Sequence, residues 1–201
     1  MLDISLPYKG IIMKIEHDAI QRDMQPFLPN GCSFKFFSVG DEAEWARIEA
    51  SVLEFDSDDD ALNYFKKEYL PYIQLLQKRC IFVVDIKGLP IATSTAWFAN
   101  SNEYGRQASL EWVAVCSEHQ GKGIGKAIMQ KALQVFCDVE PNLDIWLHTQ
   151  TWSHVAVKMY LQLGFQMVEN DRLAKPFKNE FYDNEYSEAI EIFNEIGFKK
   201  L

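Results

Sequence analysis

Three alternating glycines follow a strand-like segment in the middle of the chain. Gly121, Gly123 and Gly125 lie within Gln120–Lys126, shortly after the apolar run Val113–Val115. Glycine lets a backbone approach a ligand closely, and the free N–H groups at the start of a helix attract anions with the help of the helix dipole. The pattern therefore predicts a site for a phosphate-bearing ligand, of which a pyrophosphate is the best fit.

Two common phosphate motifs are excluded by the spacing. A dinucleotide-binding fingerprint needs a third glycine three residues after Gly123, where this chain has Lys126. A Walker loop needs Gly-Lys-Ser or Gly-Lys-Thr after a four-residue gap from its first glycine, and that is absent from the sequence. What remains is a Gln-x-x-Gly-x-Gly pattern that begins at Gln120.

This pattern, together with the preceding Val-Ala-Val strand, resembles the acetyl-CoA-binding motif of the GNAT superfamily of N-acetyltransferases. The segment 153–165 is similar to the second motif of that family, Asn-x-x-Ala-x-x-x-Tyr-x-x-x-Gly-Phe. Tyr160, Gly164 and Phe165 match it, whereas Ser153 stands where Asn is usual. A serine hydroxyl could still bond a pantetheine arm. The matching order of elements covers roughly residues 32–170.

The resemblance implies a mixed α/β (α+β-like) fold with a central, mostly antiparallel sheet flanked by helices. The fourth and fifth strands of that sheet would splay, and acetyl-pantetheine would lie in the gap like an added strand. The co-substrate would be acetyl-CoA, and a primary amine would take the acetyl group directly in a ternary complex. The cofactor-binding residues that the resemblance implies are Val113, Ala114, Val115, Gln120, Gly121, Lys122, Gly123, Ile124, Gly125, Lys126 and Ser153.

Acetyl transfer requires an amine that loses a proton, a donor for the oxyanion and a proton for the leaving thiolate. Tyr160 is the candidate acid, because the family places this tyrosine beside the sulfur. Glu111 is the candidate base, since it lies two residues before Val113 and so on the same face of the strand. Two other interpretations remain open. Tyr160 fits a packed helical stripe, and Glu111 could be solvated or orient the substrate while the proton leaves through water.

No metal site is expected. His148 and His154 lack the spacing and partner residues of a zinc site, although His148 lies on a strand that could line an acceptor channel. The acids of Asp56–Asp60 alternate like calcium ligands, but Ala61 stands where an EF-hand loop needs glycine and Lys67 where it needs glutamate. Helix capping is the better account of these acids.

Composition and charge restrict the partners. The chain has 201 residues, of which 48% are hydrophobic, and a net charge of −9. This acidity argues against nucleic acid as the main partner. It suits a cationic acceptor, toward which Glu49 and Glu54 could contribute, but acidity for solubility alone explains it at least as well. The most apolar run is far shorter than the roughly 20 residues of a membrane span, and the N-terminus lacks the order of a signal peptide.

The four cysteines are scattered without a C-x-x-C pair, so a disulfide framework is not expected and the cytoplasm is the default location. They are Cys32, Cys80, Cys116 and Cys137.

Hydrophobic periodicity predicts a single domain with extensions. Residues 1–31 form an N-terminal extension with a strand-like patch at Gly10–Ile15, residues 32–181 form the acetyltransferase domain, and residues 182–201 form a C-terminal amphipathic helix. Inside the domain the order is one strand, two helices with a kink or break at Pro71, a three-stranded meander, helix, strand, helix and strand. Arg172–Phe181 is a poor candidate for a further strand, because Pro176 lies inside it.

The sequence leaves two functional alternatives open besides acetyl transfer. A different acyl-CoA would fit the same phosphate loop, and a non-catalytic regulatory module could keep the loop to bind acyl-CoA. A homodimer is also left open, with the C-terminal helix packed either on its own domain or on a partner subunit.

Overall fold

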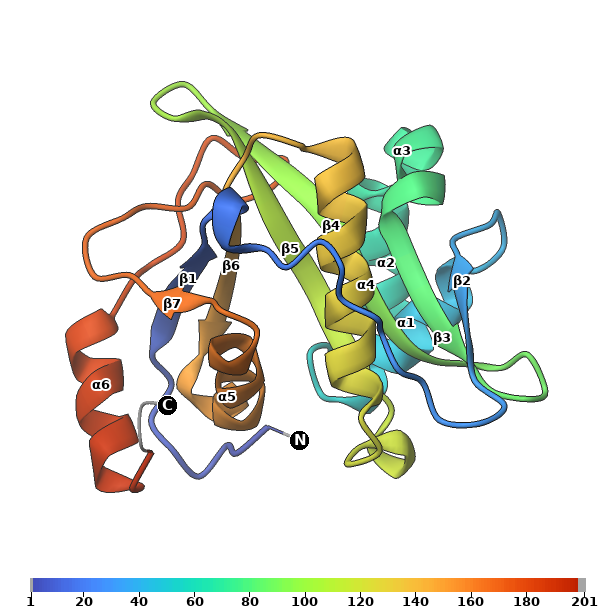
Figure 1. The fold of residues 1–201 in the computed structure, drawn as a ribbon, viewed down its shortest axis with the longest axis horizontal. Coiled ribbons are helices and arrows are strands. Elements are labelled where there is room, and N and C mark those ends of the chain that lie inside the picture. The colour runs from blue at the N-terminus through green and yellow to red at the C-terminus, as the bar shows by residue number, and fades with distance from the viewer. Residues whose placement is uncertain (1, 199–201) are drawn as a thin grey trace. The chain divides into compact units, whose positions relative to one another are not determined.

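The computed structural model describes residues 2–198 as a mixed α/β fold with a seven-stranded, mostly antiparallel sheet and flanking helices (Figure 1). The fold class predicted from the sequence is confirmed. The hydrogen-bonded strand order is β2-β3-β4-β5-β6-β1-β7. The strands are β1 (Gly10–Ile15), β2 (Ser33–Phe36), β3 (Cys80–Val84), β4 (Pro90–Ser101), β5 (Gly105–Val115), β6 (Ile145–Gln150) and β7 (Gln166–Met167).

The helices are α1 (Glu42–Ser51), α2 (Asp58–Glu68), α3 (Ile73–Arg79), α4 (Ile124–Val139), α5 (His154–Gln162) and α6 (Tyr186–Glu195). Short 3-10 turns join several of them, including η2 (Leu70–Tyr72), η3 (Ser117–His119) and η4 (Thr151–Ser153). No helix within residues 2–198 is long and apolar enough to cross a membrane.

The chain divides into two compact units. Among residues 2–198, the first unit holds 2–21, 97–110 and 140–198, and the second holds 22–96 and 111–139. β4 and β5 each contribute residues to both units. The domain boundaries expected from the sequence, at residues 31 and 181, stay a prediction.

In the first unit, β1 is a central strand. It pairs antiparallel with β6 from Gly10↔Gln150 to Ile15↔Ile145, and with β7 at Met13↔Met167. Ile11, Ile12 and Met13 are fully buried, as expected for a strand covered on both faces. The strand-like patch near the N-terminus is thus a strand of the main sheet, and α6 packs against it.

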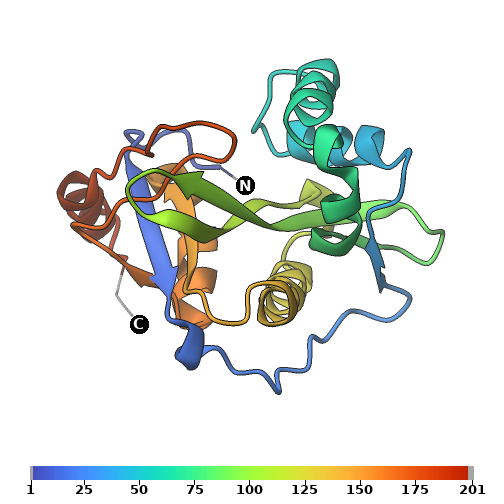
Figure 2. The same cartoon turned by 90° about the horizontal axis from the view of Figure 1, so that it is seen from above.

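In the second unit, β2, β3 and β4 form an antiparallel ladder in which Cys80 pairs with Thr95. Helices α1 and α2 pack together on one face of these strands, and α4 contacts β3 from the opposite face (Figure 2). The long helix α4 buries an apolar stripe of which Ile128, Met129, Ala132, Leu133 and Phe136 are fully covered. This packing fixes α4, the helix that follows the first two glycines of the Gln120–Lys126 motif. We call the segment Gln120–Gly123 the glycine loop.

The region of the two predicted helices contains three. Pro71 lacks a backbone N–H and its ring collides with the preceding turn, so α2 ends at Glu68 and α3 begins at Ile73 after the η2 turn. The expected break is confirmed, and a separate helix follows it.

The spacing of Asp41 and Glu44 in the sequence predicts a capping box at the start of α1, and this prediction is wrong. The Asp41 side chain makes no cap hydrogen bond to α1, because its two carboxylate oxygens accept from Lys35 Nζ at 2.6 Å and from the amide of Ser38 at 2.7 Å. Ser57 caps α2 instead, where its hydroxyl accepts from the amide of Asp60 at 3.1 Å. The acids Asp58–Asp60 occupy the first turn of α2, where the helix dipole favours negative charge.

The C-terminal strands are short. The last strand expected in the domain contributes only the two residues of β7. The segment Arg172–Phe181 contains one isolated antiparallel β-bridge, Ala174↔Phe181. This agrees with the expectation that Pro176 weakens any strand there.

The aromatic core of the second unit gives a stability test. Phe65 is fully buried and its ring lies 4.8 Å from that of Trp45 and 5.5 Å from that of Phe37. We expect Phe65→Ala to lower the free energy of unfolding by about 3–5 kcal/mol, through lost apolar burial and a residual cavity. Urea unfolding followed by circular dichroism measures it. The control Phe27→Ala, at a side chain that is 81% exposed, should change the value by less than about 0.5 kcal/mol. Equal effects of the two substitutions would contradict the assignment of Phe65 to the core.

Candidate active site

The glycine loop links β5 to α4 through the short η3 turn. Gly121 and Gly123 have φ angles of +73° and +84°, in the left-handed region that side chains rarely adopt. A Cβ added to either residue would have no atom within 4 Å, so the space beside both glycines is open. Gln120 holds the base of the loop, because its side-chain amide donates to the carbonyl of Val115 at 2.9 Å.

The first amide groups of α4 face the end of this loop. The helical bond from the amide of Ala127 to the carbonyl of Gly123 measures 3.0 Å. The amides of Ile124, Gly125 and Lys126 come before it, where an α-helix has no intrahelical acceptors to offer. Such a helix start is an anion site of the kind that binds phosphate. Gly125 lies inside the helix and lacks the positive φ of the other two glycines, so its role differs from theirs.

The two lysines of the motif are exposed. Lys122 donates from Nζ to the backbone carbonyl of Glu118 at 2.8 Å, which folds its side chain back over the η3 turn. Lys126 lies in the first turn of α4. Both are close in sequence to the loop amides and add positive charge there.

The end of β5 carries an irregular backbone at the residues singled out in the sequence. Trp112 has a φ of +53°, between the candidate base Glu111 and the candidate pantetheine-binding Val113. For a bulky residue this conformation is an outlier that costs on the order of 1–3 kcal/mol, and such strain concentrates at functional sites. Ala114 is buried, whereas Glu111, Val113 and Val115 are half-buried.

The other two candidate residues belong to the first unit. Tyr160 is 7% exposed on α5, and its ring lies 6.0 Å from that of Phe165. Ser153 ends the η4 turn directly before α5, and its side chain makes no cap hydrogen bond to that helix. The second unit brings together Glu111, Val113–Val115 and the glycine loop.

The model of the acetyltransferase (GNAT) family matches residues 43–165, which is more than half of the chain and includes β5, the glycine loop, α4 and α5. The chain belongs to the GNAT family. The family resemblance found in the sequence is confirmed, with the substrate unassigned.

The sequence similarity to individual relatives is limited and covers only part of each protein. This GNAT chain is 41% identical over 61 residues to N-acetyltransferase 8B of Rattus norvegicus, covering 30% of the chain and 27% of the relative. It is 28% identical over 123 residues to N-acetyltransferase 8F1 of Mus musculus, covering 61% of the chain and 51% of that protein. The chain thus matches about half the length of these relatives or less.

A solved structure of similar fold is the GCN5-related N-acetyltransferase from Sphaerobacter thermophilus. The TM-score is 0.61 at 19% sequence identity, over 81% of this chain and 49% of the other. At this identity the likeness shows the fold alone, and it agrees with the strand and helix order of the GNAT family.

His148 of the GNAT chain lies in a setting that the sequence did not reveal. Its imidazole stacks on the ring of Tyr182 with centroids 4.2 Å apart and planes 8° from parallel. Gly10 allows this arrangement, because an added Cβ would lie 2.8 Å from the carbonyl oxygen of Asp183 and 3.0 Å from His148 Nε2. Contacts between segments this far apart in the chain leave no local pattern, so only the fold could reveal them.

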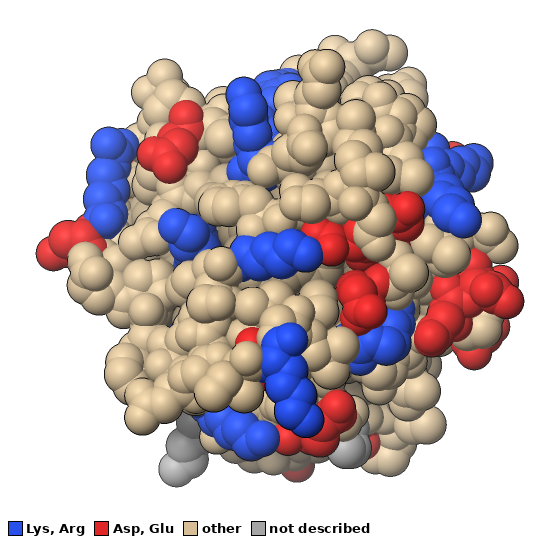
Figure 3. All heavy atoms as spheres, turned by 90° about the vertical axis from the view of Figure 1, so that its right-hand side faces the viewer, with Lys and Arg blue, Asp and Glu red and all other residues tan. Residues whose placement is uncertain are grey.

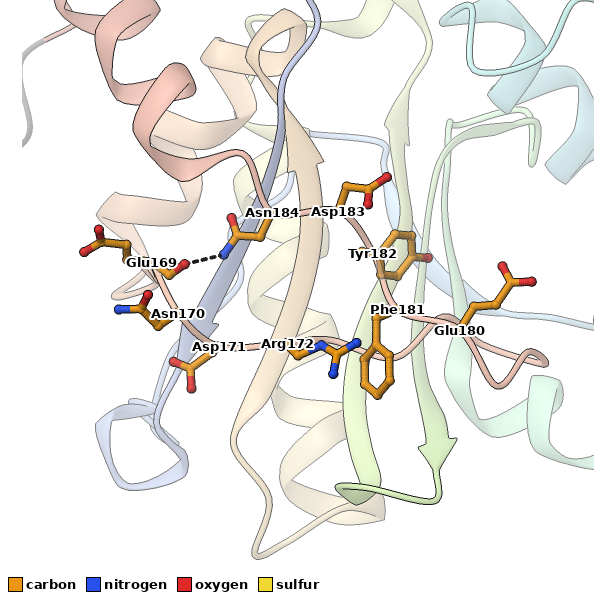
Figure 4. Close-up of a pocket in the computed structure, with 9 residues that line it drawn as sticks. All are labelled: Glu169, Asn170, Asp171, Arg172, Glu180, Phe181, Tyr182, Asp183 and Asn184. Atoms are coloured by element: carbon orange, nitrogen blue, oxygen red, sulfur yellow. Dashed lines mark hydrogen bonds between the residues drawn. The ribbon is translucent and has the colours of Figure 1, made fainter.

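A pocket of about 620 Å³ lies in the same unit along the segment after β7 (Figure 4). Arg172 is its cation, and it contacts the ring of Phe181 at 3.8 Å and pairs with Glu103 at 3.0 Å. Asn184 donates to the carbonyl of Glu169 at 3.1 Å and so ties the two ends of the segment together. The residues that line the pocket are Glu169, Asn170, Asp171, Arg172, Glu180, Phe181, Tyr182, Asp183 and Asn184. None of them was predicted from the sequence to be a site residue.

Among the described residues, no group of three or more histidines, cysteines or acids is arranged to hold a metal ion. All four cysteines are free thiols.

The stacked histidine predicts a pH dependence of stability. Burial, and after it the charge of Lys175, lowers the pKa of His148 to about 4 from 6.5, against the opposite influence of Asp183 and Glu185. The unfolded chain therefore takes up a proton at higher pH than the folded chain does. The stabilisation is complete above pH 6.5 and is lost as the pH falls toward 4, by on the order of 3 kcal/mol.

Urea unfolding at pH 7.5, 5.5 and 4.5 measures this loss, with His148→Gln as the variant that lacks the titrating group. We expect the variant to lose less stability on acidification than the native chain. His119→Gln, a substitution in the η3 turn, should keep the native pH dependence. If the free energy of unfolding changed with pH in the same way for the native chain and His148→Gln, the loss of stability could not be assigned to His148.

Proposed function

We propose that the protein is an N-acetyltransferase that moves an acetyl group from acetyl-CoA to a primary amine in a ternary complex. The observation that carries this proposal is the glycine loop of a GNAT chain, with Gly121 and Gly123 in left-handed conformations and open space beside both. The loop leads into the free amide groups of α4, which suit a pyrophosphate. The partners and the cytoplasmic location expected from the sequence stay predictions.

The backbone of β5 is the proposed partner of the pantetheine arm. The parallel register of β5 with β6 pairs Ala108 with Ile145 and Ser109 with Trp146, and Val113 and Val115 lie further along β5. An extended chain can add to a strand through backbone hydrogen bonds, as peptides do at a sheet edge. We assign Val113 and Val115 to the pantetheine amides, and the amides of Gln120–Lys126 to the pyrophosphate.

The chemical step joins the amine nitrogen to the carbonyl carbon of the thioester. The C–S bond breaks as the tetrahedral intermediate collapses, and the thiolate of CoA leaves. The amine proton passes to Glu111, directly or through water, and the thiolate takes a proton from the hydroxyl of Tyr160. A backbone N–H near Val113–Val115 donates to the oxyanion, and Ser153 bonds the pantetheine arm.

Substitution of a loop glycine tests donor binding. We expect Gly123→Val to weaken acetyl-CoA binding about tenfold or more, because a side chain strains a φ of +84° and fills the space beside the loop. Isothermal titration calorimetry measures the dissociation constant, with free adenosine as a ligand control.

The chain offers a matched control for this substitution. Gly88 has a φ of +80° and likewise no atom within 4 Å of an added Cβ, but it lies in the turn between β3 and β4. Gly88→Val should carry the same backbone strain and leave acetyl-CoA binding unchanged. A folded native protein that binds no acetyl-CoA, or equal weakening by both substitutions, would overturn the proposed phosphate site.

Removal of one hydroxyl tests the acid. Tyr160→Phe should keep acetyl-CoA affinity and lower kcat about tenfold or more, because the thiolate then leaves without its proton donor. Thiol release from acetyl-CoA with a panel of primary amines measures turnover. The control Tyr72→Phe, at a tyrosine that is 45% exposed, should keep native turnover. Native kcat in Tyr160→Phe would assign this tyrosine to core packing alone.

The same assay separates the alternatives. Faster turnover with succinyl- or propionyl-CoA than with acetyl-CoA would replace the donor in the proposal. Tight acetyl-CoA binding without acetylation of any amine in the panel would favour a regulatory module that binds acyl-CoA.

A further inference from the structure

A cluster of six aromatic rings lies in the second unit, and we call it the aromatic cluster. Its members come from α1, the segment after α1, α2 and its C-terminal end, and β5. Neighbouring rings have centroid separations between 4.8 and 6.4 Å. The six residues are Trp45, Phe55, Tyr64, Phe65, Tyr69 and Trp112.

The aromatic cluster has a covered side and a more open side. Trp45, Phe65 and Tyr69 are buried, whereas Phe55, Tyr64 and Trp112 are half-buried. Trp112 joins the two sides, with ring centroids 5.4 Å from Trp45 and 5.1 Å from Phe55. The strained backbone at Trp112 places this ring, and the same strand carries the candidate base Glu111.

A buried carboxyl lies on the helix that supplies Trp45. Glu49 is four residues after Trp45 on α1, hence on the same face of the helix, and it is 1% exposed. Its Oε1 atom is buried without a hydrogen-bond partner. Burial, and after it the nearby carboxylate of Glu54, raises the pKa of Glu49 well above its usual range. The amide of Glu54 donates to the carbonyl of Glu49 at 3.2 Å, which places the two residues side by side.

Two further carboxylates lie near Tyr64. Burial, and after it the charges of Glu111 and Glu68, raises the pKa of Tyr64 above its usual value. Glu68 is paired with Lys67 at 2.7 Å. Glu111 and Glu68 therefore lie near Tyr64, while Glu49 shares the buried face of α1 with Trp45 and Glu54 directly precedes Phe55. Figure 3 shows acidic side chains interspersed with basic ones on the face of the molecule on the α1–α3 side.

We propose that the aromatic cluster with Glu49, Glu54 and Glu111 binds an alkyl diamine as the acetyl acceptor. This inference rests on the proposed transferase function and names its substrate class. One amino group is acetylated next to Glu111. The other stays protonated, lies against the ring faces and donates to the unpartnered oxygen of Glu49.

Three physical terms favour this ligand. An ammonium group is attracted to the faces of Trp and Tyr rings, and most strongly when it is desolvated. The methylene chain removes apolar surface from water against the rings. A charge-assisted hydrogen bond supplies the donor that Glu49 Oε1 lacks, and Glu54 adds a second negative charge.

The test compares two acceptors of equal length, 1,4-diaminobutane and 1-aminobutane, in steady-state acetylation. We expect kcat/KM to favour the diamine at least about tenfold, as one charge-assisted hydrogen bond predicts. Glu49→Gln keeps the shape of the side chain but cannot take the negative charge that a bound ammonium group would stabilise. It should lower kcat/KM for the diamine about tenfold more than for the monoamine, through KM. Asp59→Asn, which removes one acid from the first turn of α2, should keep the preference.

Glu54→Gln provides a second variant if Glu49→Gln fails to fold, and it should reduce the diamine preference in the same direction. Calorimetric titration with 1,4-diaminobutane supplies a readout besides activity, and binding should weaken in Glu49→Gln. Equal acetylation of the two amines, in all variants, would overturn the diamine site and leave the transferase function standing. If no amine is acetylated, the transferase proposal fails, and the calorimetric comparison still decides whether the cation site exists.

Discussion

The burial of one face of α4 is the constraint on which the candidate site depends. Ile124, Ala127 and Ile128 begin an apolar stripe that packs against β3, so the helix axis and the direction of its first amide groups are fixed by the core. A helix cannot satisfy its first amides internally, and here the residues before it are glycines in left-handed conformations rather than a capping side chain. The hydrophobic core thus fixes the first backbone N–H groups of α4 as hydrogen-bond donors, and the glycine loop leaves open space beside them.

The sequence predicted the loop better than it predicted the surroundings of the loop. Strand, glycines and helix follow one another within about twenty residues, so their local pattern is complete in the sequence. Gly125 shows the limit of this approach, because it shares the alternating pattern but lies inside α4 with an ordinary backbone. Spacing alone does not distinguish a glycine that requires a positive φ from one that merely fits a helix.

Asp41 and Ser57 show why the helix ends were harder to predict. Both residue types suit an N-cap, and Asp41 is followed by Glu44 three residues later, which favours a capping box. In the folded chain Lys35 reaches Asp41 from β2, and the carboxylate turns away from the helix toward it and toward the amide of Ser38. A contact set by tertiary structure overrides the local preference. The same holds for the stack of His148 on Tyr182 and for the aromatic cluster, whose rings converge from four separate segments.

Glu49 is the residue that folding alone explains least well. It continues the stripe of Trp45 and Ile48 on the buried face of α1, where an apolar side chain would gain transfer free energy and satisfy the core. A buried acceptor without a partner instead costs about 1–3 kcal/mol, and the neighbouring carboxylate of Glu54 opposes ionisation. This cost falls beside six aromatic rings and a strained strand that carries Glu111. A cation bound there would offset this cost, because it supplies both a hydrogen-bond donor and a positive charge. The buried carboxyl thus lowers the stability of the ligand-free protein and raises its affinity for cationic ligands.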